Sequence, residues 1–170
     1  MENAFSTADL CDLFLDRSEG LQVVAPGLRC YGGHRAYCGP IATVAPAAAG
    51  GAVRLREVLS EPGEGRVLVA DGEANDAWAV LGDQLAALGM RNGWAGVVLN
   101  GYVRDVRALR ELDFGVHALG AVPARPRDFS ANTCGHALGF GRVRFTPGSW
   151  LYADEDGIIV CAERQPNQQA

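Results

Sequence analysis

The middle of the chain carries the clearest pattern of apolar and polar positions. Residues 66–71 form an apolar run that ends in Asp-Gly, and residues 95–100 form a second apolar run. Between them, residues 82–91 place Leu85 and Leu88 at helical spacing. Short apolar runs bounded by turn residues are typical of buried strands, so the predicted order is strand, helix, strand. Both runs are apolar on both faces, which indicates a sheet that is covered on each side.

The first third of the chain predicts a helix, short strands and a second helix. Ser6 can cap a helix that runs to about Arg17. Residues 22–41 mix glycine and proline with short apolar pieces, a composition typical of strands joined by tight turns. Residues 42–51 are almost entirely Ala, Pro, Val and Gly and predict a packed strand and turn rather than a linker. Helical periodicity returns at residues 53–59.

The remainder of the chain predicts one more helix and then mostly strands. Residues 106–112 have helical spacing, and residues 116–119 read as a strand. Apolar and polar residues then alternate with period two at residues 140–145. Asp156-Gly157 signals a hairpin between extended segments at residues 150–153 and 158–162. We therefore expect a mixed α/β fold with a β-rich second half, in which the last third of the chain is an antiparallel meander.

Length and charge narrow the classes of function. A chain of 170 residues suits one domain with a substantial core, which we place at residues 1–162, and we expect residues 163–170 to be a flexible tail. The formal net charge is −5, and the 15 basic residues are scattered along the chain. Direct binding to nucleic acid is disfavoured, because it draws most of its affinity from clustered Lys and Arg.

The cysteines and the N-terminus bear on the compartment. The five cysteines are odd in number and form no C-x-x-C pair, which disfavours a disulfide framework or a zinc ribbon and favours reduced thiols. The first residues lack the features of a signal peptide, and no apolar run approaches the roughly 20 residues that span a bilayer. We expect a cytoplasmic protein without membrane contact.

Two charged steps, Gly82-Asp83 and Arg104-Asp105, are the strongest candidates for chemistry. Gly82 precedes a predicted helix, whose first amide groups lack intrahelical acceptors and attract a carboxylate. Arg104 and Asp105 follow a buried strand, and ligands of α/β sheets gather at the carboxyl ends of strands. Alone, each step has a simpler interpretation, since Asp83 suits a first helical turn and Asp105 can cap a helix starting near Val106.

The two steps together are more specific than either one. If the strands at residues 66–71 and 95–100 are parallel neighbours, the loops that follow them lie on the same edge of the sheet. Two carboxylates and a guanidinium would then line one pocket. Such a set can hold a divalent cation beside an anionic oxo acid.

Other motifs point to structure rather than chemistry. Asp154-Glu-Asp-Gly157 opens like a calcium loop but lacks its later ligands, so we interpret it as a hairpin turn. Cys134 and His136 have no partner with metal-ligand spacing. His34 and His117 stand singly, which favours surface or core roles. No G-x-G-x-x-G follows a predicted strand, so a dinucleotide site is unsupported.

Eight phrases spread over the chain resemble the RraA-like family, which contains regulators of ribonuclease E activity and class II 4-hydroxy-4-methyl-2-oxoglutarate aldolases. They are STADLCD (6–12), YGG (31–33), GRVLV (65–69), LGD (81–83), NGWAGVV (92–98), NGYVRD (100–105), LDFGV (112–116) and LYADEDGIIV (151–160). The resemblance covers residues 6–160. It implies a compact layered β/β/α domain with mixed sheets and a ring-shaped homotrimer, or a hexamer made of two such rings.

The aldolase branch of that family carries the pattern G-D, twenty residues, R-D, which is intact here. By resemblance, Asp105 would ligate Mg²⁺ or Mn²⁺, and Asp83 would order a metal-bound water. Arg104 would hold a small 2-oxo acid and stabilise its enolate. The backbone of Gly82, Asp83, Gln84 and Leu85 would receive the substrate carboxylate. The implied reaction is pyruvate release from 4-hydroxy-4-methyl-2-oxoglutarate, with oxaloacetate decarboxylation as a second activity.

The regulator branch supplies the alternative function, a non-catalytic protein that binds ribonuclease E or a helicase. It commonly lacks the second acidic residue of the pattern, so Asp105 favours the aldolase. Two segments depart from the family. Glu73, Ala74 and Asn75 stand in a loop that is glycine-rich in many relatives, and residues 45–51 are more apolar than usual. The C-terminal extension that supplies a Glu to a neighbouring subunit in characterised aldolases is not evident.

Overall fold

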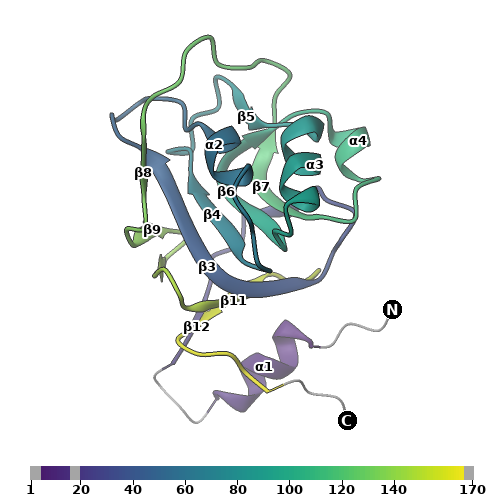
Figure 1. Cartoon of the computed structure of the whole chain (residues 1–170). Helices are drawn as coiled ribbons and strands as arrows, with labels where there is room; N and C mark the ends of the chain where they lie inside the picture. The colour runs from purple at the N-terminus through teal and green to yellow at the C-terminus, as the bar shows by residue number, and fades with distance from the viewer. Residues whose placement is uncertain (1–4, 16–19, 167–170) are drawn as a thin grey trace.

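Parallel strands at the centre of the computed structural model are covered by helices on one face and by further strands on the other (Figure 1). The structure describes residues 5–15 and 20–166. The helices are α1 (Thr7–Leu13), α2 (Leu55–Leu59), α3 (Asp83–Arg91) and α4 (Val106–Leu109). None of the helices in these ranges has the length and apolar character needed to cross a bilayer.

Twelve strands are present in the described ranges, ten of them in one mixed sheet. In the first half they are β1 (Leu21–Val23), β2 (Arg29–Cys30), β3 (Tyr37–Pro46), β4 (Val67–Asp71), β5 (Ala79–Leu81) and β6 (Gly96–Val103). In the second half they are β7 (Gly115–Ala121), β8 (Asn132–Cys134), β9 (Leu138–Phe140), β10 (Val143–Phe145), β11 (Trp150–Ala153) and β12 (Ile158–Cys161). The mixed α/β class and the β-rich second half are confirmed.

The sheet is parallel at its centre and antiparallel at one end. Its order is β1-β12-β11-β3-β4-β6-β7-β2, with β5 paired to β6 and β8 paired to β3. Strands β3, β4, β6 and β7 are parallel neighbours, whereas β11, β12 and β1 run antiparallel. Strand β3 belongs to both parts and curves strongly between them (Figure 1). The predicted parallel pairing of β4 with β6 is confirmed, and Asp71 at the end of β4 pairs with Asn100, three residues before the end of β6.

The alternation of side chains along β4 explains the layers. Leu68 and Ala70 pack in the core under the helices, together with Leu59 from α2 and Ala86 from α3. Val67 and Val69, on the opposite face, belong to a second core that includes residues of β10, β11 and β12. Because successive side chains of a strand point to opposite faces, a strand apolar at every position serves two cores. The β/β/α layering follows from this arrangement.

Helix α1 packs outside these layers, against the β11–β12 hairpin (Figure 1). The Ser6 side chain accepts a hydrogen bond from the Asp9 amide at 3.2 Å, as expected of an N-cap. Leu10 packs on the hairpin, and the buried carboxylate of Asp154 accepts hydrogen bonds from the Thr7 amide (2.7 Å) and hydroxyl (2.6 Å). The helix ends at Leu13 with Phe14 as its C-cap, so the prediction that it runs to about residue 17 was wrong.

The structure corrects the prediction at residues 140–145, which form a hairpin rather than one strand. Gly141 and Arg142 have φ of 59° and 62° and form a two-residue turn between β9 and β10. Two positive φ angles are the signature of the tight turn that suits paired strands. The sheet of β9 and β10 is separate from the large one, so the expected meander is interrupted. The prediction failed because the alternation of apolar residues continues across the turn.

Candidate active site

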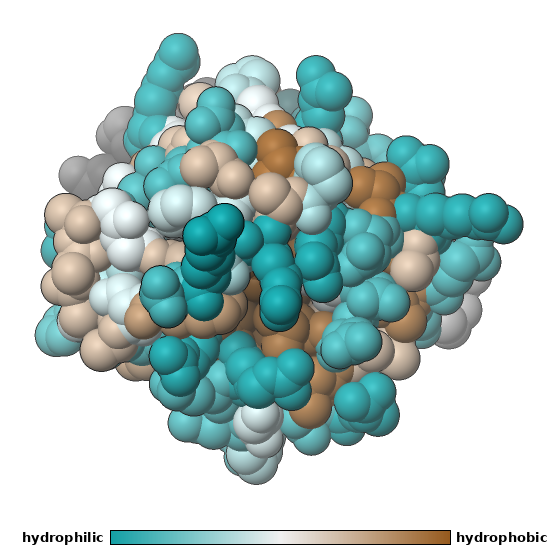
Figure 2. Space-filling view, turned by 90° about the horizontal axis from the view of Figure 1, so that it is seen from above, coloured by the Kyte–Doolittle hydropathy of each residue, from teal (hydrophilic) through white to brown (hydrophobic). Residues whose placement is uncertain are grey.

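A cavity of about 430 Å³ lies beside the start of α3 and the end of β6. Every residue that the sequence proposed for the site lines it: Gly82, Asp83, Gln84, Leu85, Arg104 and Asp105. The other lining residues come from α2 and its N-cap, from β5 and from the loop after β7: Arg54, Leu55, Arg56, Glu57, Ala79, Val80, Arg125, Pro126 and Phe129. Seen from above, the molecule shows apolar surface between polar side chains near its centre (Figure 2).

The two charged steps are brought together by the short strand β5. Leu81 pairs with Val103 of β6, and the Arg104 amide donates a hydrogen bond to the Leu81 carbonyl at 3.0 Å. The residues that follow each strand are therefore neighbours. A Cβ atom added to Gly82 would lie 2.5 Å from Asp105 Oδ2 and 3.3 Å from Arg104 Nε. The expected meeting of the two loops is confirmed, although the strand that joins them was not predicted.

Asp105 has an unusual backbone conformation. Its φ of 59° and ψ of 37° lie in the left-handed region, which costs a residue with a Cβ roughly 1 kcal/mol. Asp105 occupies the N-cap position of α4, yet its side chain makes no capping hydrogen bond. Its Oδ2 lies instead 3.3 Å from Arg104 Nε. The alternative that this carboxylate serves as a helix cap is therefore wrong, and the carboxylate is directed to the cavity wall.

Asp83 begins α3 and stays close to its own backbone. Its Oδ1 accepts a hydrogen bond from the Gln84 amide at 2.7 Å, and Gly82 at the N-cap contributes no side-chain cap. This contact agrees with the simpler interpretation, that Asp83 stabilises the first turn of the helix. Oδ2 of Asp83 accepts no hydrogen bond within the described ranges. Asp83 therefore combines a helix-start role with a carboxylate oxygen on the cavity wall.

Three arginines of the cavity were missed by sequence reasoning. Arg54 lies 3.6 Å from the Glu57 carboxylate, whereas Arg56 and Arg125 form no ion pair with any residue that the structure describes. Arg54 lies just before α2 and Arg56 lies on it, and no sequence motif identifies either residue as part of a site. Arg125 follows β7, a parallel neighbour of β6, so the rule that ligands gather at carboxyl strand ends could have found it.

The donor atoms of the cavity fit a hard divalent cation. No group of three or more His, Cys, Asp or Glu residues in the described part of the chain could enclose a metal ion. Asp83 and Asp105 nevertheless place two carboxylates on the cavity, and Asp105 is free of the helix cap. Mg²⁺ is commonly bound by one or two carboxylates, with water and substrate oxygens completing its ligands. These two carboxylates suit Mg²⁺ or Mn²⁺, and they lack the nitrogen and sulfur ligands of a zinc site.

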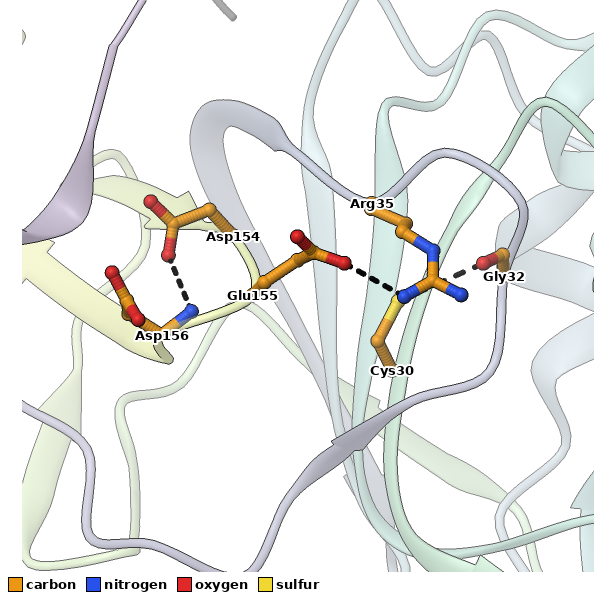
Figure 3. A network of polar contacts seen from close by, with 6 residues as sticks. All are labelled: Cys30, Gly32, Arg35, Asp154, Glu155 and Asp156. Atoms are coloured by element: carbon orange, nitrogen blue, oxygen red, sulfur yellow. Dashed lines mark hydrogen bonds and ion pairs between the residues drawn. The ribbon is translucent and has the colours of Figure 1, made fainter.

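The motifs set aside from the sequence have structural roles. The Asp154 Oδ1 atom accepts a hydrogen bond from the Asp156 amide at 3.0 Å, and Glu155 pairs with Arg35 at 2.7 Å (Figure 3). Because Thr7 also binds Asp154, that carboxylate is occupied, and the hairpin-turn interpretation is confirmed. All five cysteines are free, as expected.

Two histidines also lie away from the cavity. His34 is on the surface, where its Nδ1 lies 2.7 Å from the Asp113 carboxylate. His117 is buried in β7, and its Nδ1 lies 2.8 Å from the Tyr37 hydroxyl. Burial lowers the pKa of His117 from its usual 6.5 to about 4, so the ring is neutral at physiological pH. Both placements agree with the surface and core roles expected from the sequence.

Comparison with known sequences gives one consistent family. A family model described as RraA-like, Aldolase/RraA, matches residues 7–160. A protein from Laribacter hongkongensis (strain HLHK9) is 50% identical over 156 residues, which are 92% of this chain and 95% of that protein. One from Aromatoleum aromaticum is 44% identical with the same coverage. Both carry the name "Putative 4-hydroxy-4-methyl-2-oxoglutarate aldolase".

Two solved structures share the fold. One, from Geobacillus kaustophilus HTA426, is named S-adenosylmethionine: 2-dimethylmenaquinone methyltransferase, and it is 38% identical with a TM-score of 0.87 over 98% of this chain and all of that one. The other, named the RNA-processing inhibitor RraA from Thermus thermophilis, is 32% identical with a TM-score of 0.84 over 100% of this chain and 99% of that one. The names of these relatives and of the two solved structures state different activities. The choice among these activities for this chain therefore depends on the chemistry of its cavity.

Proposed function

This chain belongs to the RraA-like family, and we propose that it is a divalent-metal-dependent aldolase that releases pyruvate from 4-hydroxy-4-methyl-2-oxoglutarate and related 4-hydroxy-2-oxo acids. The observation that carries the proposal is that Gly82 lies so close to the Arg104-Asp105 pair on the cavity wall that an added Cβ would clash with it. A guanidinium, a carboxylate that caps no helix and a helix start then face one space. The aldolase name of relatives up to 50% identical supports the same reaction.

We assign the metal to the carboxylates of the cavity. Asp105 would be the direct ligand of Mg²⁺ or Mn²⁺, with Asp83 beside it. When bound, the cation supplies positive charge that polarises the 2-oxo group of the substrate. The left-handed backbone of Asp105 supports this role, because strain of this kind is concentrated at functional sites.

Arg104 and the start of α3 would bind the oxo acid end of the substrate. The first-turn amides of a helix lack intrahelical acceptors and attract a carboxylate. Arg104 uses one N–H toward Asp105, which leaves other donors of the guanidinium for the substrate. As the bond between C3 and C4 breaks, its electron pair moves to form the enolate of pyruvate. Arg104 stabilises the negative charge that develops there.

Proton transfer would fall to Asp83. The C4 hydroxyl must lose its proton as C4 becomes a carbonyl carbon, and C3 of the enolate must gain one to give pyruvate. Oδ1 of Asp83 is engaged by the Gln84 amide, so Oδ2 is the atom that accepts the hydroxyl proton, directly or through water. Oxaloacetate decarboxylation forms the same enolate with loss of CO₂ and needs no hydroxyl deprotonation. We therefore include it as a second activity.

The charge of the cavity suits a dicarboxylic substrate. Four arginines and three carboxylates line it, and a bound divalent cation would make the positive excess larger. A dianion such as 4-hydroxy-4-methyl-2-oxoglutarate is favoured over a monoanion by this balance. Methyl transfer from S-adenosylmethionine, the reaction for which the Geobacillus protein is named, finds no support, since the sequence has no glycine motif for a nucleotide.

The alternative from another class is a non-catalytic partner of ribonuclease E or of a helicase. Its support is the Thermus structure, named an RNA-processing inhibitor, at 32% identity. Protein binding gives no reason for the strained backbone that directs the Asp105 carboxylate to the cavity. We therefore place the regulator function second. Assembly as a homotrimer or hexamer is a further prediction from the family, to be measured by sedimentation.

Pyruvate release from 4-hydroxy-4-methyl-2-oxoglutarate and from oxaloacetate tests the proposal. Turnover should require Mg²⁺ or Mn²⁺ and stop with chelator, and Asp105→Ala and Arg104→Ala should each lower it by at least about 100-fold. A wild type that turns over neither substrate with metal, yet slows ribonuclease E in a purified mixture, would establish the regulator instead.

A further inference from the structure

One part of the cavity wall has no role in the chemistry described above. Arg54, at the N-cap of α2, and Phe129, in the loop after β7, both line the cavity. The guanidinium carbon of Arg54 lies 5.5 Å from the centre of the Phe129 ring. Phe129 is 41% exposed, which is unusual for a large apolar side chain. An exposed aromatic ring that lines a cavity has surface available for a ligand.

The pair is held in place by the backbone. Asn132 Oδ1 accepts a hydrogen bond from the Arg54 amide at 3.0 Å, and Asn132 Nδ2 donates one to the Arg54 carbonyl at 2.8 Å. The Ser130 amide donates to the Ala52 carbonyl at 2.9 Å. The segment that follows Phe129 is thus fixed to Ala52 and to Arg54, at the start of α2. The arginine and the ring are positioned before any ligand arrives.

The contacts of Arg54 leave it able to bind an anion. A guanidinium that stacks on a ring uses its face, and its N–H groups remain at the edge. The Glu57 carboxylate, at 3.6 Å, is beyond hydrogen-bond distance and half or more exposed. A carboxylate of the substrate can therefore replace Glu57 at little cost. The ring beside it offers apolar surface to a small alkyl group.

We propose that Arg54 and Phe129 are the specificity-determining pair for the distal half of the substrate. Arg54 receives the carboxylate beyond C4, and Phe129 receives the alkyl substituent on C4. This inference rests on the proposed aldolase function. Arg54 is preferred over Arg125 because its backbone is clamped and its guanidinium is stacked, so less motion is lost on binding.

The test compares substrates rather than absolute rates. The dicarboxylate ratio is the specificity constant, kcat/KM, with 4-hydroxy-4-methyl-2-oxoglutarate divided by the same constant with 4-hydroxy-2-oxopentanoate, which lacks the distal carboxylate. Arg54→Leu should lower this ratio about 10- to 100-fold, mainly through KM, as expected for loss of a charge-assisted hydrogen bond. Arg54→Lys should restore part of it. Arg144→Leu, an exposed arginine on β10 that does not line the cavity, should leave the ratio as in the wild type.

Phe129 is tested by the C4 substituent. The methyl ratio is the specificity constant with the 4-methyl substrate divided by that with 4-hydroxy-2-oxoglutarate. It should fall several-fold in Phe129→Ala, since a methyl group in an apolar pocket gives roughly tenfold discrimination. Phe129→Leu should retain most of it. Thermal melts show whether each variant is folded.

Three outcomes would overturn the inference. If Arg54→Leu keeps the dicarboxylate ratio while Arg125→Leu loses it, the distal carboxylate binds Arg125. If Phe129→Ala keeps the methyl ratio, the ring does not contact C4. If the folded wild type turns over none of these substrates with metal, the aldolase function fails first and this inference with it.

Discussion

Substitution of Gly82 by alanine gives the sharpest structural test of the site. Gly82 has φ of −134° and ψ of −173°, an extended conformation that any residue can adopt. Alanine therefore brings no backbone strain. Its Cβ, however, would lie 2.5 Å from Asp105 Oδ2, where ordinary contact begins near 3.4 Å. One added methyl group thus acts mainly on the proposed metal ligand and, less strongly, on Arg104 beside it.

The size of the effect follows from these distances. The Asp105 oxygen must move by about 0.9 Å to restore ordinary contact, and Arg104 Nε, at 3.3 Å from the same Cβ, is also crowded. A misplacement near 1 Å in a reacting group costs about 100-fold in rate. Stability should change much less, because Asp105 Oδ2 ends a side chain that can turn away. Alanine for glycine at an N-cap costs about 1 kcal/mol or less.

Steady-state pyruvate release and urea unfolding measure the two effects. Gly82→Ala should lose about 100-fold in kcat/KM on both substrates while unfolding close to the wild-type midpoint. Gly139→Ala on β9 is the matched control, because a Cβ there meets nothing within 4 Å. Activity within threefold of wild type in Gly82→Ala would refute the assignment of the Asp105 carboxylate to the reacting centre.

Three further predictions test other residues. Asp83→Asn should lower the rate of aldol cleavage by at least about 100-fold but the rate of oxaloacetate decarboxylation by less than tenfold. Only cleavage needs the hydroxyl proton to be removed, so equal losses of the two activities would contradict the role of Asp83 as base. His117 has a folded pKa of about 4 against 6.5 unfolded, so the unfolded state binds the extra proton and stability should rise from pH 4 to 6.5. The rise from this buried ring should be roughly 3 kcal/mol in urea unfolding and absent in His117→Gln, and parallel pH curves for the two proteins would contradict it. Ala74→Gly should stabilise the fold by roughly 0.5 kcal/mol, because Ala74 has φ of 53°; a lower unfolding midpoint would show that the loop is not strained.

The central strands and the position of the candidate site residues could be predicted because their signals are local. Val67 to Ala70 are apolar at every position, and the structure places alternate members in the two cores. The predicted parallel pairing of β4 with β6 is present, whereas the unpredicted pairing of β5 with β6 is what brings the Gly82-Asp83 step near Arg104. The loop at Glu73 and Ala74 has positive φ at both residues, a conformation that favours glycine.

What could not be predicted depends on contacts distant in sequence. Strand β5 has three residues and exists because β6 changes partner after Asn100, where its register shifts. The left-handed backbone of Asp105 has no sequence signature, since aspartate is also a common helix cap. Arg54 meets Phe129 across 75 positions of sequence, through the Asn132 clamp. Each of these features depends on contacts in the folded structure rather than on the local sequence.

Exchange of the methyl protons of pyruvate in D₂O tests the central claim most directly, because it reports enolate formation without any aldol substrate. With Mg²⁺ or Mn²⁺, the wild type should exchange these protons well above the buffer rate, as followed by loss of the methyl signal in proton NMR. Chelator, Asp105→Ala and Arg104→Ala should each return the rate to background, whereas Gly139→Ala should not. A folded, metal-supplied wild type that exchanges no faster than buffer would contradict the claim that this cavity stabilises the pyruvate enolate.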